Sequence, residues 1–217
     1  MDQNEWVIFN DELMQVKDVT IDPLSSSMQY GLNVFEGIRV YCEEEEKYIV
    51  GINQHFSRLV ASAKAMHLKT NHSKDLMLDW ITTLVKLNKI ENDFSIRCNL
   101  FPTTKGSWQM KHESKMFLCV QENKRLDSNH LPKIKAMVSS WLKNSDNSMC
   151  SKVKAGANYI NARYGQMEAI QKGYDLALFF NHNGTLAESG GSSVGIIKEN
   201  ILYFPKLTDS VLDSVTR

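Results

Sequence analysis

The sequence predicts an α+β fold made of two α/β domains, and three observations support this. In the first 122 residues, segments with the apolar pattern of strands alternate with two long segments of helical periodicity. A polar stretch, residues 123–133, holds one of only four prolines and is typical of a linker. A second set of strand, helix and hairpin patterns follows in residues 134–217. We therefore expect a small N-terminal domain at 1–122 and a second domain at 134–217.

The first domain opens with two hairpins. Residues 6–10 and 12–16 are short apolar runs separated by a polar step, which is the pattern of a β-hairpin. Residues 35–52 indicate two further strands on either side of an acidic turn at 43–47. We interpret this acidic run as the solvated tip of a hairpin and not as a functional charge motif.

Two amphipathic helices and two strands complete the first domain. Residues 53–68 predict a helix with Asn53 as its N-cap. Its apolar face consists of Phe56, Leu59, Val60, Ala63 and Met66. Residues 73–90 predict a second helix, capped by Ser73 and with an apolar stripe of Leu76, Trp80, Leu84 and Leu87. Residues 94–102 and 115–122 have the pattern of strands.

The second domain combines one strand, one helix and two hairpins. Residues 134–141 are strand-like, and residues 158–173 predict a helix that ends at Gly173, with Tyr164, Met167 and Ile170 toward the core. The Asn-Gly pair at 183–184 is a strong signal for a hairpin within residues 175–189. Residues 193–204 predict another hairpin. The last eight residues, SVLDSVTR, contain Ser, Asp and Thr, which favour the start of a helix.

The composition narrows the functional classes. Apolar residues make up 42% and charged residues 23% of the 217, and 25 basic residues balance 25 acidic ones, so the basic excess of a nucleic-acid-binding protein is missing. The first residues lack the pattern of a signal peptide, and no apolar run approaches the ~18–20 residues of a membrane span, so we expect a cytoplasmic protein. The cysteines are widely spaced, and we expect buried, reduced thiols at Cys42, Cys98, Cys119 and Cys150.

The motifs of common metalloenzymes and phosphate-binding loops are missing from the sequence. There is no H-E-x-x-H and no P-loop, and the six histidines are scattered, so we expect no metal site and no hydrolytic triad. What remains is a dispersed set of short motifs. They are YGLNVFEGIRVY at 30–41, HFSRL at 55–59, SIR at 95–97, KVKAGANYINA at 152–162, AESGG at 187–191 and SVTR at 214–217.

Taken in this order, these motifs resemble the branched-chain amino-acid aminotransferases, which are fold-type IV enzymes that use pyridoxal 5′-phosphate (PLP). The resemblance extends from about Trp6 to Arg217, and its most specific parts are YGLNVFEGIRVY and the block from Lys154 to Glu188. It implies the two-domain fold of these enzymes, small-molecule amino acid and 2-oxo acid substrates, and a homodimer or higher homo-oligomer. The implied reaction transfers the amino group of Leu, Ile or Val to 2-oxoglutarate.

The resemblance also implies how PLP is held. A lysine four residues before an Asn-Tyr pair forms the Schiff base with the cofactor and then moves the proton, and this position is Lys154 and not Lys152. Glu188 matches the carboxylate that keeps the pyridine nitrogen protonated, so that the ring is an electron sink. Tyr159 matches the tyrosine at the ring 3′-oxygen, and Arg58 matches an arginine at the phosphate.

The end of the chain and the substrate pocket complete the implied site. Val215 and Thr216 match residues whose backbone amides bind the phosphate at the start of a helix, where free N–H groups favour an anion. The implied substrate-binding residues are Tyr30, Phe35, Gly37, Arg39 and Arg97. An aromatic wall suits an aliphatic side chain, whereas Arg97 would meet the second carboxylate of glutamate or 2-oxoglutarate.

Several positions depart from the family pattern. Ser95 stands where the family has an aromatic residue, Cys98 replaces a proline, Ser192 and Ser193 replace Glu-Asn, and Ser214 replaces a glycine. Family members also continue beyond the match to SVTR, so we expect a truncated second domain. Two alternatives therefore stay open: a D-amino-acid transaminase or aminodeoxychorismate lyase of the same fold, and a catalytically impaired remnant.

Overall fold

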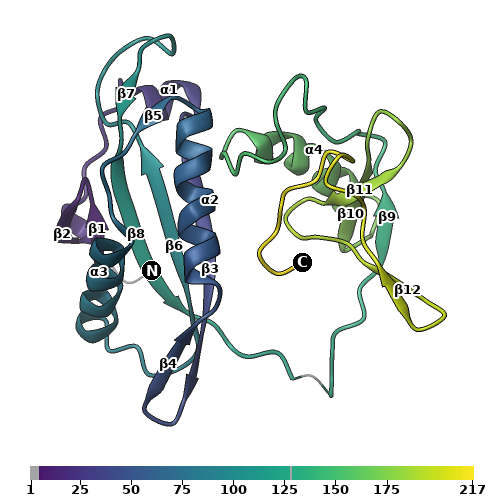
Figure 1. The fold of residues 1–217 in the computed structure, drawn as a ribbon, viewed down its shortest axis with the longest axis horizontal. Coiled ribbons are helices and arrows are strands. Elements are labelled where there is room, and N and C mark those ends of the chain that lie inside the picture. Colours follow the sequence, from purple (N-terminus) through teal and green to yellow (C-terminus); the bar gives the residue numbers. More distant parts are fainter. Residues whose placement is uncertain (1–4, 128) are drawn as a thin grey trace. The chain divides into compact units, whose positions relative to one another are not determined.

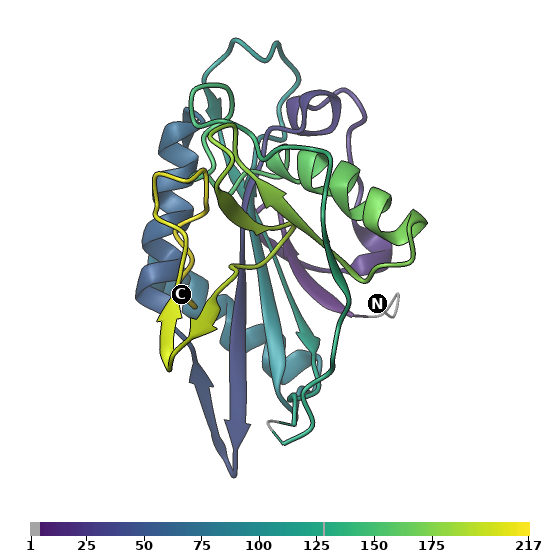
Figure 2. The ribbon, with the colours of Figure 1, turned by 90° about the vertical axis from the view of Figure 1, so that its right-hand side faces the viewer.

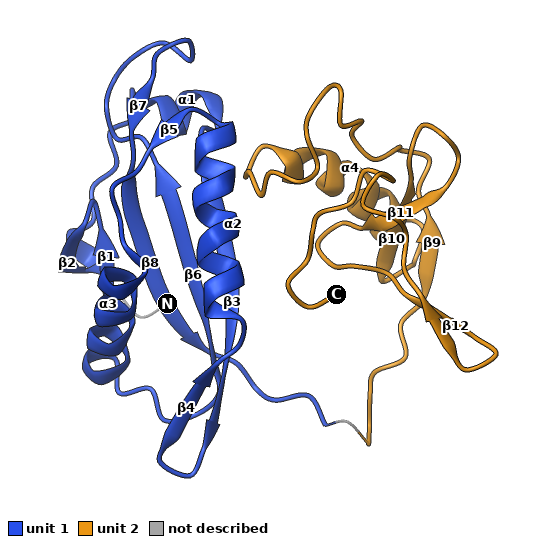
Figure 3. Cartoon of the chain, in the orientation of Figure 1, with its two compact units in different colours: residues 1–127 blue, residues 128–217 orange. Residues whose placement is uncertain are grey.

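The computed structural model of the chain describes residues 5–127 and 129–217. The chain divides into two compact units, residues 1–127 and 128–217, and the boundary lies within the predicted linker at 123–133 (Figures 1 and 3). Each unit has its own sheet and its own buried residues.

The first unit is built on a six-stranded sheet with the order β2-β1-β8-β6-β3-β4, in which every neighbouring pair is antiparallel. Its strands are β1 (Trp6–Phe9), β2 (Glu12–Gln15), β3 (Val34–Glu43), β4 (Glu46–Ile49), β6 (Phe94–Phe101) and β8 (Lys115–Glu122). The short strands β5 (Leu68–Lys69) and β7 (His112–Glu113) form a separate parallel pair. The helical segments are η1 (Val16–Asp18), α1 (Ser26–Tyr30), α2 (Ile52–Ala65) and α3 (Lys74–Leu87).

Strand alternation in the first unit separates the two faces of the sheet. Along β3, the buried side chains of Val34, Glu36 and Ile38 share one face of the sheet. This is the face covered by α2, from which Arg58 donates to Glu36. Phe35 and Gly37 point to the opposite side, because successive side chains of a strand alternate. The hairpin of β3 and β4 extends beyond the other strands, and its exposed acidic tip confirms the interpretation of residues 43–47 (Figures 1 and 2).

Helix α2 begins two residues earlier than predicted. Its N-cap is Gly51 at φ 59°, so Asn53 lies in the first turn and the prediction of Asn53 as N-cap was wrong. Glycine suits this position because it adopts positive φ without steric cost. The buried face consists of His55, Leu59, Ser62 and Ala63, and two of these are polar residues that an apolar pattern does not identify.

Helix α3 has the predicted cap but a rotated core face. The Ser73 hydroxyl accepts the Leu76 N–H at 3.1 Å, which confirms the N-cap. The buried residues are Met77, Ile81 and Leu84, whereas Leu76 and Leu87 are exposed, so the predicted stripe was correct only at Leu84. Both stripes satisfy helical spacing, because apolar residues occupy more than half of this helix's circumference.

The second unit contains a three-stranded sheet, one long helix and a separate hairpin. The sheet has the order β11-β10-β9, with β9 parallel and β11 antiparallel to β10. The predicted hairpins at 175–189 and 193–204 are both confirmed. The elements are β9 (Ala136–Val138), α4 (Asn158–Gln171), β10 (Leu176–Phe180), β11 (Leu186–Ser189), β12 (Ile196–Lys198) and β13 (Ile201–Tyr203).

Small residues of α4 lie against β10. Ala162, Gly165 and Ala169 are buried, whereas Tyr164, Met167 and Ile170 are exposed, so the predicted core face of this helix was wrong. The fully buried Phe179 of β10 comes so close that a Cβ on Gly165 would lie 2.4 Å from its ring. A large side chain on this face would therefore have no room.

The cysteines agree only in part with the prediction. All four are free thiols, Cys98 and Cys119 are buried, Cys42 is half-buried and Cys150 is exposed. Burial raises the pKa of the Cys119 thiol to about 11 and raises that of Cys98 further. Within residues 5–127 and 129–217, no helix is long and apolar enough to cross a membrane.

Candidate active site

Lys154 lies in a tightly held loop just before α4. Its Nζ donates to the Tyr159 hydroxyl at 2.9 Å, across the first turn of the helix. The side-chain amide of Asn158 donates to the carbonyls of Cys150 (3.1 Å) and Val153 (2.9 Å) and so ties the loop to the helix start. Lys154 is half-buried, whereas Lys152 is exposed. Of the two lysines, only Lys154 has this paired, partly desolvated setting.

Glu188 of β11 is a buried carboxylate with two donors. The Lys143 ammonium lies 2.7 Å from Oε1, and the Leu212 N–H donates to Oε2 at 3.1 Å. The side chains of Lys143 and Glu188 are only 9% and 10% exposed, so this ion pair is largely removed from water. Lys143 was not among the residues predicted from the sequence.

The last four residues form a turn and not a helix. The Ser214 hydroxyl accepts the Thr216 N–H at 3.3 Å and lies 2.9 Å from the Thr216 hydroxyl, while the Arg217 N–H donates to the Ser214 carbonyl. Ser214 therefore bonds to the turn as a helix-capping serine would. Val215 and Thr216 are the central residues of this turn.

Arg58 belongs to the first unit and is bound to a buried acid. Its guanidinium donates to both oxygens of Glu36, at 2.7 Å and 2.6 Å, and His55 Nδ1 lies 2.7 Å from the same carboxylate. Burial alone would raise the pKa of Glu36, but the hydrogen bonds from Arg58 and His55 outweigh burial and lower it. Arg58 is thus held in one geometry by a bidentate pair.

Four of the five predicted substrate-binding residues, Phe35, Gly37, Arg39 and Arg97, share the face of the sheet opposite α2. Gly37 of β3 is paired with Arg97 of β6, and the Arg97 guanidinium lies over the Phe35 ring, 4.5 Å from its centroid. Tyr30 is separate from them, at the end of α1, and is 44% exposed.

Arg39 is engaged elsewhere in the first unit. Its guanidinium lies 3.5 Å from Asp93 and donates to the carbonyls of Asn123 and Lys124 at 2.9 Å and 3.1 Å. These contacts fix the chain where it leaves β8. The observed contacts of Arg39 are thus structural, and its role toward substrate stays a prediction.

Comparison with known proteins gives the same family at the level of sequence and of fold. The model of the class IV aminotransferases matches residues 33–217. The chain belongs to this family. Two sequence relatives are a probable branched-chain-amino-acid aminotransferase of Aquifex aeolicus (29% identical, covering 98% of this chain and 70% of the relative) and the branched-chain-amino-acid aminotransferase of Pseudomonas aeruginosa (28% identical, covering 100% and 71%).

Solved class IV aminotransferases have the same fold. A branched-chain aminotransferase of Thermoproteus uzoniensis, solved with norvaline, matches with a TM-score of 0.89 at 26% identity over 96% of this chain and 70% of that one. The PLP form of the Thermobaculum terrenum enzyme matches with a TM-score of 0.89 at 25% identity over 100% and 71%. These similarities confirm the predicted family and the predicted fold-type IV class.

The paired residues of the second unit fit the cofactor that the family implies. PLP requires an amine for its aldehyde, an acid at its ring nitrogen and donors for its phosphate. The amine of Lys154, the buried carboxylate of Glu188 and the N–H groups of the turn at 214–217 are of these three kinds. Among the described residues, no group of three or more His, Cys, Asp or Glu side chains could hold a metal ion.

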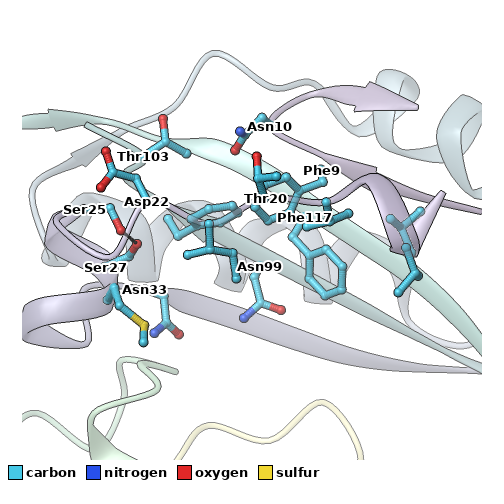
Figure 4. Close-up of a pocket in the computed structure, with 16 residues that line it drawn as sticks. Phe9, Asn10, Thr20, Asp22, Ser25, Ser27, Asn33, Asn99, Thr103 and Phe117 are labelled. Atoms are coloured by element: carbon cyan, nitrogen blue, oxygen red, sulfur yellow. Dashed lines mark hydrogen bonds between the residues drawn. The ribbon is translucent and has the colours of Figure 1, made fainter. Parts of the chain in front are cut away.

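A cavity that the sequence did not indicate lies in the first unit of this aminotransferase. Its volume is about 660 Å³, and Phe9, Phe117 and Asn99 are among the residues that line it (Figure 4). None of the five predicted substrate-binding residues lines it. Its walls come from β1, β6, β8 and the segment before α1, which are remote in sequence, so no local motif could reveal it.

Proposed function

We propose that this class IV aminotransferase is PLP-dependent and transfers the amino group of branched-chain L-amino acids (Leu, Ile, Val) to 2-oxoglutarate. The products are the branched 2-oxo acids and glutamate. The observation that carries the proposal is the hydrogen bond between the Lys154 amine and the Tyr159 hydroxyl, at the two positions that the family motif assigns to the cofactor. The names of the sequence relatives, which cover nearly the whole chain, support the substrate class.

Different residues of the second unit would bind different parts of the cofactor. When bound, PLP supplies an electron sink for the pair of electrons released at the substrate α-carbon. Lys154 would hold the cofactor's aldehyde carbon covalently, and once displaced by substrate, its Nζ would accept the proton from the α-carbon. The Tyr159 hydroxyl, which lies 2.9 Å from this amine, would orient it and bind the ring 3′-oxygen.

Glu188 and the terminal turn would hold the two ends of the ring. The buried carboxylate of Glu188 would accept a hydrogen bond from the protonated ring nitrogen, a charge-assisted bond that strengthens in a site removed from water. The backbone N–H groups of Val215 and Thr216 would donate to the phosphate, for which the Thr216 N–H would exchange its present bond to the Ser214 hydroxyl. The assignment of Arg58 to the phosphate stays a prediction from the family motif.

The substrate side of the proposal rests on the first unit. Phe35 would contact the aliphatic side chain, next to the open backbone at Gly37, and Tyr30 would border the pocket. Arg97 would pair with the second carboxylate of 2-oxoglutarate or glutamate. Its guanidinium lies over the Phe35 ring, which would place an apolar surface and a cation in the same pocket. We also propose a homodimer.

A coupled assay tests the proposed reaction. The purified chain with PLP, leucine and 2-oxoglutarate is expected to form glutamate, and Lys154→Ala is expected to reduce this rate to background. Lys152→Ala is the matched control, because Lys152 is exposed and two residues away, and it should keep the rate. Activity with D-alanine but not with leucine would favour a D-amino-acid transaminase instead, and no activity with either would favour an impaired remnant.

Replacement of Arg97 tests the dual-substrate pocket. Loss of a charge-assisted hydrogen bond costs roughly 1.5–3 kcal/mol, so Arg97→Ala should lower kcat/KM for 2-oxoglutarate by about 10- to 100-fold. The half-reaction with leucine should change little, because leucine has no second carboxylate. Equal losses for both substrates would show that Arg97 does not discriminate between them.

A further inference from the structure

Lys143 is a buried cation to which the family motif gives no function here. It follows β9, and its backbone N–H donates to the Phe180 carbonyl at 2.8 Å, which continues the pairing of this segment with β10. From there its side chain reaches the Glu188 carboxylate on β11, on the far side of β10. The ammonium lies 5.9 Å from the centroid of the fully buried Phe179 ring.

Each oxygen of Glu188 has its own donor. Lys143 Nζ lies 2.7 Å from Oε1, and the Leu212 N–H donates to Oε2 at 3.1 Å. Two donors on different oxygens fix both the position and the plane of the carboxylate. An ionised carboxylate has about four acceptor sites, so these two contacts leave capacity for a further donor.

The charge of Lys143 matters as much as its hydrogen bond. An isolated carboxylate that is 10% exposed carries a desolvation cost, which an ammonium at 2.7 Å offsets. Without Lys143, only the Leu212 N–H would hold the carboxylate, which would then be free to turn toward water. The negative charge would then be displaced from the position where the proposed function requires it.

We infer that Lys143 is a positioning residue for PLP binding: it holds the Glu188 carboxylate in the place and orientation in which it would meet the ring nitrogen. The inference rests on the proposed function, in which Glu188 meets that nitrogen. In this proposal Lys143 acts only through its contact with Glu188. It would therefore affect the ring nitrogen alone and leave the amine and the phosphate donors unchanged.

The test compares the affinity of Lys143→Met and of the unmodified chain for PLP, measured by titration of visible absorbance. Loss of an outer-shell partner typically weakens a site by about 10-fold or more, and we expect a weakening of this order. Lys172→Met is the matched control, because it removes another Lys–Glu pair of the same unit, with Glu168 at 2.6 Å, from an exposed position. It should bind PLP as the unmodified chain does. Equal affinity of Lys143→Met and the unmodified chain would overturn the inference.

A cofactor analogue separates positioning from a general structural role. In 1-deaza-pyridoxal phosphate a carbon replaces the ring nitrogen, so Glu188 has no partner on the ring. Lys143→Met should therefore bind this analogue about as well as the unmodified chain does. A loss of affinity for the analogue that equals the loss for PLP would show that Lys143 only stabilises the unit, and would overturn the inference.

A double variant covers the case in which Lys143→Met does not fold. Lys143→Met/Glu188→Gln leaves no uncompensated buried charge, and its affinity for PLP should equal that of Glu188→Gln alone. A further loss would show that Lys143 acts independently of Glu188, which contradicts the inference. If the unmodified chain gives no absorbance that depends on Lys154, the proposed function fails. If the unmodified chain binds PLP through Lys154 but Lys143→Met binds PLP equally well, the inference fails and the proposed function stands.

Discussion

Asp93 shows how one side chain can connect distant segments of the first unit. Its carboxylate accepts the Cys42 N–H at 2.8 Å and two hydrogen bonds from Arg125, at 2.8 Å and 3.1 Å. Arg39 lies 3.5 Å from it. The hydrogen bonds from Arg125 and from the backbone of Cys42 lower the pKa of Asp93 to about 2. Asp93 thus joins β3, the start of β6 and the chain beyond β8.

The lowered pKa predicts a dependence of stability on pH. Because Asp93 is more acidic in the folded than in the unfolded chain, its contribution is complete above the unfolded value of 3.8 and is lost as the pH falls toward 2. Asp93→Asn should lower the melting temperature at pH 7. Between pH 5 and 2 the melting temperature of this variant should decrease less than that of the unmodified chain. Thermal denaturation over this range measures both effects. Asp18→Asn, at an exposed position, is the control, and a mutant curve parallel to the wild-type curve would contradict this account.

For single residues, the sequence predicted site residues that belong to a local motif. Lys154 and Tyr159 are five residues apart, and the turn that leads from the loop into α4 is enough to bring their side chains together. Lys143 could not be found in this way. Its partner Glu188 is 45 positions away, and only the pairing of β9, β10 and β11 brings the two residues together. For Arg39, in contrast, the motif gave the position but did not reveal the contacts with Asp93 and with the linker.

At the scale of elements, the hairpins were predictable and the core faces of the helices were not. Turn chemistry is local, so the Asn-Gly turn and the acidic tip were recognised from a few residues. The orientation of a helix depends on what it packs against. In α4 the buried face carries Ala162, Gly165 and Ala169, because the large Phe179 of β10 occupies the space beside them. A search for large apolar residues therefore selects the wrong side.

The fit between α4 and β10 predicts a sensitive glycine. In Gly165→Ala the new Cβ would lie 2.4 Å from Phe179 and 2.8 Å from the Ser139 hydroxyl. Alanine gains roughly 0.5–1 kcal/mol of helix propensity, but overpacking against the fully buried Phe179 costs about 1–3 kcal/mol. Net destabilisation of the second unit is therefore expected in denaturant titrations. Gly191→Ala, with no atom within 4 Å of its Cβ, should change the free energy of unfolding by less than about 0.5 kcal/mol. If both variants were equally stable, the structure would have adjusted around the new Cβ beside Phe179, and the prediction would be wrong.

At the scale of the whole molecule, the order of motifs along the chain determined the family, although each motif alone is weak. The two-unit fold and the class IV family agree with that prediction, and the relatives match nearly all of the chain. The predicted residues fall into both units. The second unit holds Lys154, Tyr159, Glu188 and the turn with Val215 and Thr216, and the first holds Arg58 and the proposed substrate-binding residues. The central claim is therefore that Lys154 of the second unit is the residue that binds PLP.

Peptide mapping of the borohydride-reduced chain tests this claim most directly. Sodium borohydride makes the bond between PLP and a lysine amine permanent, so the modified residue can be identified by mass spectrometry. We predict that one equivalent of the phosphopyridoxyl group is found on Lys154. Modification of Lys152 instead, or label spread over the exposed lysines without enrichment at Lys154, would contradict the account.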